Sequence, residues 1–166
     1  MPEVDPAVPA SEWLLGERGR AAARELGSVM PAEPAILSSP NPKTRQTAEQ
    51  LHTVAGGILS IDDRLIEVQR ANIWLEDYRA VALSYVLGAL PPGWEPHEQV
   101  AGRLSGVVAL AQARAQGRPV VLVGHGLSTT VWLNSQGKLE DPAAFWSELR
   151  FPDAWRTDKL RPIRLT

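Results

Sequence analysis

The chain contains no cysteine among its 166 residues. This absence excludes a disulfide framework, a thiol nucleophile and a cysteine-ligated metal. Long apolar runs are also lacking, and no signal peptide is visible at Met1, so we expect a soluble cytoplasmic protein without a membrane partner. A strong charge of either sign is lacking as well, because the net charge is −2. Nothing in the charge therefore indicates a nucleic-acid partner.

The length of the chain is typical of one domain, which we place at 1–166. Apolar residues make up 44% of the sequence, enough for a sizeable core. Ten of the 14 prolines cluster in three stretches, each followed by a periodic apolar segment, which indicates loops between elements. These stretches are Pro2–Pro9, Pro31–Pro42 and Pro91–Pro96.

Short apolar runs alternate with helical patterns along the chain. This alternation predicts an α/β three-layer sandwich, with a mostly parallel sheet and helices on both faces. The predicted strands are Ala35–Ser38, Ile58–Ile61 and Val120–Val123, followed by one or two edge strands within Ala154–Thr166. The predicted helices are Glu17–Leu26, Lys43–Val54, Ile73–Leu87, His97–Gln116, Leu127–Asn134 and Pro142–Leu149, the last with Phe145 and Trp146 buried.

The strand Val120–Val123 is followed directly by Gly124, His125 and Gly126. Four apolar residues in a row predict a strand buried on both faces of a parallel sheet. Ligands of such sheets bind beyond the carboxyl ends of strands, and a helix N-terminus attracts anions. His125 therefore lies where a phosphate or carboxylate would bind. The alternative is a histidine that only packs in a strand–helix turn.

A second strand, Ala35–Ser38, also leads through a polar turn into a helix. Ser38 and Ser39 offer hydroxyl donors and helix N-caps at this turn. Lys43 and Arg45 place positive charge in the first helical turn, where it opposes the helix dipole. An anionic ligand would explain this unfavourable arrangement. The alternative is a pair of solvated basic side chains.

Three segments in this order resemble the histidine phosphatase superfamily, which has the phosphoglycerate mutase-like fold. They are Ser38-Ser39-Pro40 with Lys43 to Glu49, then Glu67 after Asp63-Arg64-Leu65, then the apolar strand with Gly124-His125-Gly126. The resemblance extends from Asp5 to about Trp155. It implies metal-independent hydrolysis of phosphomonoesters through a phosphohistidine, with a small phosphorylated substrate or phosphate as partner and no cofactor.

The resemblance also assigns roles to residues. His125 matches the second histidine of the family, which steadies the phosphoryl group, and Glu67 matches the acid that protonates the leaving oxygen. The alternative for Glu67 is a solvated loop carboxylate. Lys43 stands where the family usually has an arginine, and lysine keeps the charge but loses the two-pronged fork. Arg45 is two residues further along, so helical geometry turns it to a different face.

Further phosphate contacts are predicted from the same matches. Ser39 and Gly126 are expected to contact phosphate, and Ser128 is a second candidate hydroxyl donor. Trp74 and Trp94 are expected either to line the pocket or to form a hydrophobic lid packed on the core.

The nucleophilic histidine of the family has no counterpart here. The three histidines are His52, His97 and His125, and neither of the first two is preceded by arginine or followed by glycine. The arginine and the first central strand are lacking too, so the chain as written is expected to be inactive. Either Met1 is internal to a longer chain, or this is a truncated, catalytically dead relative.

Energetics favours the first explanation. Removing a central strand leaves buried backbone groups unpaired at about 1–3 kcal/mol each, in a domain whose total stability is roughly 5–15 kcal/mol. A strand borrowed from a second copy, giving a homodimer, would relieve the same cost. A scaffold that binds a phosphorylated ligand or protein without turnover is the alternative function.

Other enzyme classes fit less well. A serine nucleophile elbow would need serine at the central position that Gly126 occupies. The histidine spacing does not suit a metal site, and Thr129 replaces the third glycine of a dinucleotide-binding turn. Within the resembling family we expect a phosphatase rather than a mutase, because nothing in this short chain indicates a site that reorients a bisphosphorylated substrate.

Overall fold

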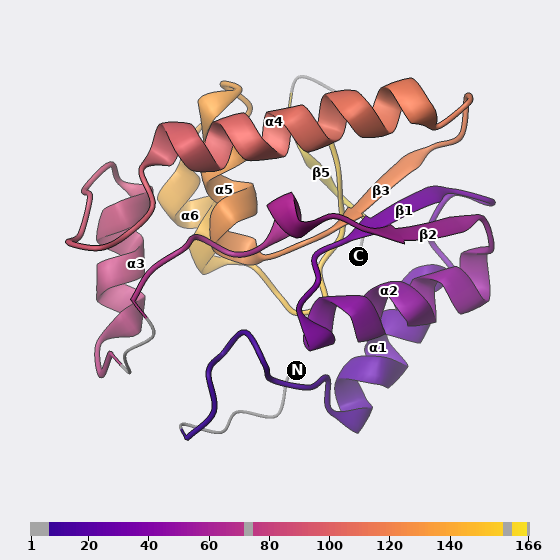
Figure 1. Cartoon of the computed structure of the whole chain (residues 1–166), viewed down its shortest axis with the longest axis horizontal. Helices are drawn as coiled ribbons and strands as arrows, with labels where there is room; N and C mark the ends of the chain where they lie inside the picture. The colour runs from indigo at the N-terminus through magenta and orange to yellow at the C-terminus, as the bar shows by residue number, and fades with distance from the viewer. Residues whose placement is uncertain (1–6, 72–74, 158–160, 166) are drawn as a thin grey trace.

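The computed structural model describes residues 7–71, 75–157 and 161–165 of the chain. Its centre is a parallel sheet in which β1 (Ala35–Ser38) lies between β2 (Ile58–Ile61) and β3 (Val120–Val123), at the bounds that the sequence predicts (Figure 1). Because all three strands run the same way, their carboxyl ends meet at one edge of the sheet. Both predicted ligand-binding turns therefore lie at that edge.

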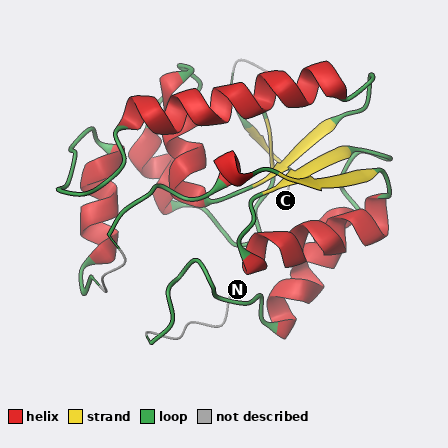
Figure 2. Ribbon diagram, in the orientation of Figure 1, coloured by secondary structure: helices red, strands yellow, loops and turns green. Residues whose placement is uncertain are grey.

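Helices lie on both faces of this sheet, as predicted. α1 (Glu17–Gly27) and α2 (Pro42–Ala55) cover one face, and α4 (His97–Arg114) crosses on the other side (Figure 2). Side chains alternate along a strand, so Ile36 and Val123 point to the same helical layer, where they pack with Leu26 and Leu51. The N-terminus of α2 is thereby fixed beside the end of β1.

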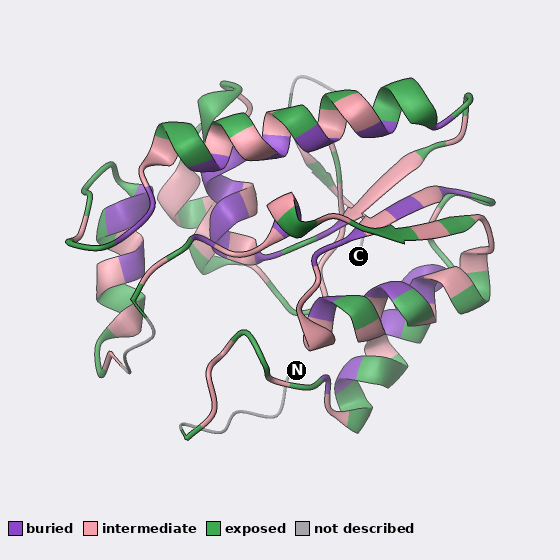
Figure 3. Cartoon of the chain, in the orientation of Figure 1, coloured by how far each residue is buried: buried purple, intermediate pink, exposed green. Residues whose placement is uncertain are grey.

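A second apolar core lies beside the sheet, among four helices. These are α3 (Tyr78–Val86), α4, α5 (Gly126–Ser135) and α6 (Pro142–Ser147). The predicted stripe on α4 is confirmed, because Val100, Leu104, Val107 and Ala111 are buried along one side of that helix (Figure 3). This core holds α5 in a fixed position, and with it His125 at the N-terminal end of α5.

The prediction that β3 is buried on both faces is wrong. Val120, Val121 and Leu122 are only half-buried, and β3 pairs with β1 alone among the described residues. Ala35 N–H donates to Pro119 O at 2.8 Å and Ser39 N–H to Val123 O at 2.9 Å. The backbone groups of Val120 and Leu122 therefore point away from β1. We call this side of β3 the open edge.

The chain after α6 forms a separate small sheet rather than edge strands of the main one, which corrects the prediction. β4 (Trp155–Arg156) and β5 (Ile163–Arg164) pair with each other in antiparallel fashion. The Trp155 ring packs on Phe145 of α6 at a centroid distance of 4.8 Å. This contact with α6 holds the hairpin to the helical layer.

Some boundaries also differ from the prediction. α3 begins at Tyr78 because the Asp77 carboxylate accepts from Ala80 N–H and caps the helix there; Ile73 lies outside the described residues. The N-cap of α2 is Asn41, not Ser38 or Ser39. α6 ends at Ser147, and its Phe145 and Trp146 are half-buried rather than buried, because one side of this short helix faces solvent.

Candidate active site

The centre of the site is a contact between the ends of two strands. His125, the N-cap residue of α5, places its Nε2 2.9 Å from the Oγ of Ser39, which follows β1. The same Oγ lies 2.9 Å from Asn41 Oδ1, which can only accept a hydrogen bond. Ser39 has one hydroxyl proton, which it donates to Asn41 Oδ1. Its oxygen is then left to accept from His125, in the neutral tautomer that carries its hydrogen on Nε2.

Burial determines the charge of His125. The residue is 8% exposed, and burial lowers its pKa to about 4, with the positive charges of Lys43 and Arg103 acting in the same direction. Glu67 opposes this shift without overcoming it. The imidazole is therefore neutral at physiological pH, and one ring nitrogen donates while the other accepts.

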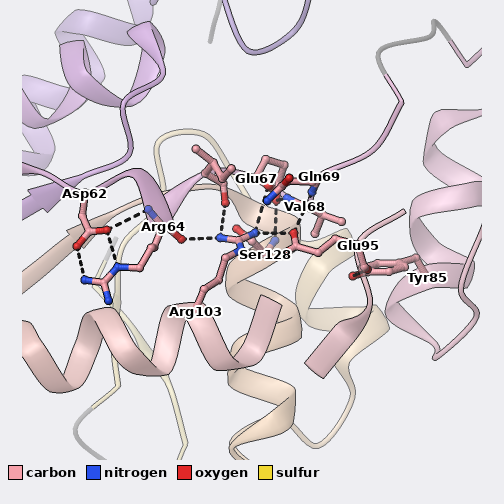
Figure 4. Close-up of polar contacts among 10 residues, drawn as sticks. Asp62, Arg64, Glu67, Val68, Gln69, Tyr85, Glu95, Arg103 and Ser128 are labelled. Carbon is pink, nitrogen blue, oxygen red and sulfur yellow. Dashed lines mark hydrogen bonds and ion pairs between the residues drawn. The ribbon is translucent and has the colours of Figure 1, made fainter. Parts of the chain in front are cut away.

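Glu67 is engaged at the start of α5 rather than solvated in its loop. Its carboxylate accepts hydrogen bonds from Ser128 N–H at 2.7 Å and Val68 N–H at 3.0 Å (Figure 4). It also accepts one from Leu127 N–H at 3.2 Å. Two of these donors are among the first backbone N–H groups of α5, which attract anions. An acidic side chain thus occupies an anion-binding position at the same helix end as His125.

Lys43 supplies a cation to the same region. The side chain is half-buried; its Nζ donates to Ala10 O at 2.6 Å and lies 5.4 Å from the centre of the Trp13 ring. Burial lowers its pKa, Arg70 adds to that effect, and the negative charge of Glu67 opposes it. Lys43 also acts electrostatically on His125, so the predicted phosphate cation and the predicted phosphate histidine belong to one charged cluster.

The other predicted contacts are placed less directly. Arg45 is exposed on α2, on a different side from the charged cluster that Lys43 joins. A Cβ added at Gly126 would lie 2.9 Å from Leu149 Cδ1, so the Leu149 side chain would have to shift to admit one. Ser128 Oγ donates weakly to His125 O at 3.4 Å. Phosphate binding by Lys43, Arg45, Ser39 and Gly126 stays a prediction.

Sequence reasoning missed Arg70. Its guanidinium lies 4.9 Å from the centre of the Tyr78 ring and 5.7 Å from that of Trp94. Arg70 acts electrostatically on Lys43 and Tyr78, and burial is the main cause that raises the pKa of Tyr78 to about 12. The available signal was a cationic residue three positions after Glu67.

Trp94 packs on the helical core and also lines a hollow. The residue is 8% exposed and its ring lies 5.1 Å from that of Tyr85 in the helical core. Its outer side also borders an open hollow of about 420 Å³ that Arg70 and Gln69 line. Trp74 lies outside the described residues.

The remaining histidines are bound elsewhere. His52 Nε2 lies 3.2 Å from Gly57 O at the far end of α2. His97 Nε2 lies 2.8 Å from Tyr85 O, and its ring stacks on Tyr85 at 4.1 Å. All three histidines of the chain are among the described residues, and His125 alone is at the site. A second imidazole for a phosphohistidine mechanism therefore has to come from outside this set.

The described residues show neither a metal-binding cluster nor a membrane span. No group of three or more histidine, cysteine or acidic side chains within residues 7–71, 75–157 and 161–165 is arranged to hold a metal ion. In the same ranges, no helix has the length and apolar character needed to cross a bilayer.

Comparisons with known proteins show the family to which the chain belongs. A family model described as histidine phosphatase superfamily (branch 1) matches residues 9–152. Mycobacterial glucosyl-3-phosphoglycerate phosphatase Rv2419c in complex with inorganic phosphate is 29% identical, with 90% of this chain and 80% of that protein covered and a TM-score of 0.63. Its complex with VO3 gives 25% identity, 92% and 86% coverage and a TM-score of 0.61.

A third solved structure is TTHB049 from Thermus thermophilus. It is 26% identical, with 95% of this chain and 87% of that protein covered and a TM-score of 0.63. A search of curated protein sequences found no match.

Proposed function

Because the chain belongs to the histidine phosphatase superfamily, we propose that its site binds phosphate and the phosphoryl group of small phosphomonoesters. The observation that carries this proposal is the buried, neutral His125, held 2.9 Å from Ser39 at the N-terminal end of α5. Phosphate complexes of the solved relative Rv2419c support the same ligand class.

Each contact suits a phosphoryl oxygen. His125 Nε2–H and the Ser39 hydroxyl become donors to phosphate once they leave Ser39 Oγ and Asn41 Oδ1, and Lys43 adds a full positive charge once its Nζ leaves Ala10 O. Lysine binds phosphate as a point charge, whereas arginine offers a fork. Arg70, on the loop of Glu67, is the residue that would supply a fork to the same ligand.

Hydrolysis needs a nucleophile in addition to these groups. We propose that a strand added to the open edge of β3 supplies it. A parallel strand in that position would end beside His125, because carboxyl ends of parallel strands meet at one edge. A histidine directly after such a strand would face the phosphoryl group across from His125.

The reaction then follows in two steps. The incoming neutral imidazole attacks phosphorus, forming a P–N bond while the P–O bond of the ester breaks, and Glu67, which takes part in this step in its protonated carboxylic acid form, gives its proton to the leaving oxygen. Water then cleaves the P–N bond, releasing phosphate and restoring the imidazole, with Glu67 accepting the proton of the water. His125 and Lys43 stabilise the transferring oxygens in both steps.

The second candidate is a scaffold that binds a phosphorylated ligand or protein without turnover. The observation in its favour is that His52 and His97 are bound away from the site. This scaffold could also be a homodimer in which two chains pair through the open edge of β3. Light scattering would detect such a dimer.

Two measurements test these proposals. Isothermal titration with phosphate and with vanadate, on the chain of 166 residues, should give saturable binding that His125→Asn abolishes. Hydrolysis of para-nitrophenyl phosphate should be undetectable in this chain and appear in a version extended at its N-terminus by an apolar strand ending in Arg-His-Gly. Binding without turnover in both forms would favour the scaffold, and the lack of binding in both would contradict the proposed site.

A further inference from the structure

Arg103 of α4 is a nearly buried arginine whose side chain is 11% exposed. Its Nε lies 2.8 Å from Glu95 Oε1 and its Nη2 lies 3.0 Å from Glu95 Oε2, which makes a two-pronged ion pair. Glu95 is itself only 5% exposed at its side chain. Such a pair resists removal of either partner, because the other would be left as an uncompensated buried charge.

The same guanidinium also binds the loop that carries Glu67. Nη1 donates to Arg64 O at 2.6 Å and to Ile66 O at 2.8 Å, and Nη2 donates to Glu67 O at 3.2 Å (Figure 4). An acceptor is thus present for each guanidinium N–H group, which is the full donor capacity of arginine. Three carbonyls within four residues of chain are fixed by one side chain.

Glu95 completes the hold on the other side of Glu67. Its Oε2 accepts from Gln69 N–H at 3.0 Å, and its own N–H donates to Gln69 O at 2.8 Å. The backbone is therefore held at Ile66 and Glu67 by Arg103 and at Gln69 by Glu95. With the backbone held, only the side chain of Glu67 can still rotate. The Leu127 and Ser128 N–H groups bind its carboxylate and so limit that rotation.

We propose that Arg103 is a positioning residue that places the Glu67 carboxylate at the N-terminus of α5, beside His125. The role of Glu67 as the acid rests on the proposed function, whereas its placement by Arg103 does not. Arg103 contacts no reacting atom; apart from its electrostatic effect on His125, it acts on the site through the loop that carries Glu67. Sequence reasoning assigned nothing to Arg103 or Glu95, because neither lies in a motif turn.

Arg64 provides a matched control at the beginning of the same loop. Its guanidinium pairs with Asp62 at 2.7 Å, and its side chain is 42% exposed. The Arg64 side chain is hydrogen-bonded to Asp62, whereas Arg103 joins α4 to the loop. Loss of Arg64 therefore removes an arginine from the loop without removing the connection to α4.

The test is amide hydrogen exchange, read by NMR at Leu127 and Ser128, whose N–H groups bind the Glu67 carboxylate. Arg103→Lys, which keeps the charge but loses the fork, should speed exchange at both amides about tenfold relative to amides inside α2, a loss of the size of one charge-assisted hydrogen bond. Arg64→Lys should change it less than about twofold.

Coupling to Glu67 distinguishes positioning from general loosening. In a Glu67→Ala background, Arg103→Lys should add nothing further at Leu127 and Ser128. Equal acceleration in both backgrounds, or none in the wild-type background, would overturn the proposal. If Arg103→Lys fails to fold, Glu95→Gln is measured instead, because it removes the charged acceptor and keeps the side-chain shape.

No phosphate is present in this experiment. A chain that fails to bind phosphate would contradict the proposed function while the exchange result still decides the role of Arg103. In the extended, hydrolysing form, Arg103→Lys should lower kcat more than it raises KM, because it displaces the acid and leaves the phosphate donors in place.

Discussion

Ser39 Oγ and His125 Nε2 lie 2.9 Å apart although 86 positions separate these residues in the chain. The contact forms because β1 and β3 are parallel neighbours, so the turns after them meet at one edge of the sheet. Both residues are buried, and each satisfies the polar group of the other. The site therefore depends on strand pairing as much as on its own side chains.

Replacement of Ser39 by alanine should weaken both folding and ligand binding. The change leaves His125 Nε2 buried without its partner, and we expect a loss of about 1–3 kcal/mol in the free energy of unfolding and a several-fold loss in phosphate affinity. Urea denaturation and isothermal titration measure the two effects. Ser60→Ala is the control, because Ser60 is exposed and its hydroxyl contact with Ile36 O is 3.5 Å long; an equal loss there would contradict this assignment.

Stability should fall in mild acid because of His125. Its pKa is about 4 in the fold against 6.5 in the unfolded chain, so between these values the unfolded state binds more protons and stability rises with pH. The contribution is complete above pH 6.5 and is lost as the pH falls toward 4, at up to about 1.4 kcal/mol per pH unit.

Denaturation curves from pH 4 to 7.5 would show this slope. His125→Asn should flatten the slope, whereas His52→Asn, which removes an imidazole at the far end of α2, should leave it unchanged. An unchanged slope in His125→Asn would show that other groups titrate in this range.

Lys43 and Arg45 should differ as phosphate cations. Lys43→Met removes the half-buried charge that acts on His125 and Glu67, and we expect phosphate affinity to fall about tenfold or more, with a weaker dependence on salt. Arg45→Met should change affinity less than about twofold, since Arg45 is exposed on α2. Titrations at two salt concentrations compare the variants, and a larger effect at Arg45 would reverse this order.

Glu67→Ala should have opposite effects on binding and on hydrolysis. Removing the carboxylate takes a negative charge from the site and leaves the Leu127 and Ser128 N–H groups available to an anion, so phosphate should bind several-fold more tightly. In the extended form, hydrolysis of an alkyl phosphate should fall by about a hundredfold or more, because the leaving oxygen loses its proton donor. Weaker phosphate binding in Glu67→Ala would contradict the anion-site interpretation.

The sequence predicted the elements that local pattern encodes. The three strands of the main sheet and the apolar stripe of α4 followed from runs and spacing, and the Gly–His–Gly turn placed His125 at the correct edge. The start of α3 was misplaced because Asp77 as an N-cap competes with the apolar pattern before it. The hairpin of β4 and β5 was assigned to the wrong sheet because short strands carry no signal for their partner.

The site was predicted only as far as motifs reach. Glu67 and His125 stand in recognisable turns, whereas Arg103 lies on the middle of a helix and looks like an ordinary charged surface residue. Its role depends on the burial of a loop against α4, which single-sequence patterns do not encode. Arg70 was missed for the same reason. Its guanidinium contacts the aromatic rings of Tyr78 and Trp94, which lie 8 and 24 positions further along the chain.

The open edge of β3 also governs how chains of this sequence behave toward one another at high concentration. Val120 to Val123 form an apolar, mostly β-branched run in which the backbone groups of Val120 and Leu122 are directed outward, and no charged or proline residue within the run discourages pairing. Such an edge promotes association of partly exposed chains into intermolecular sheets. Leu122→Lys should therefore raise the concentration that the purified protein reaches without aggregating, even where it leaves the affinity for phosphate unchanged.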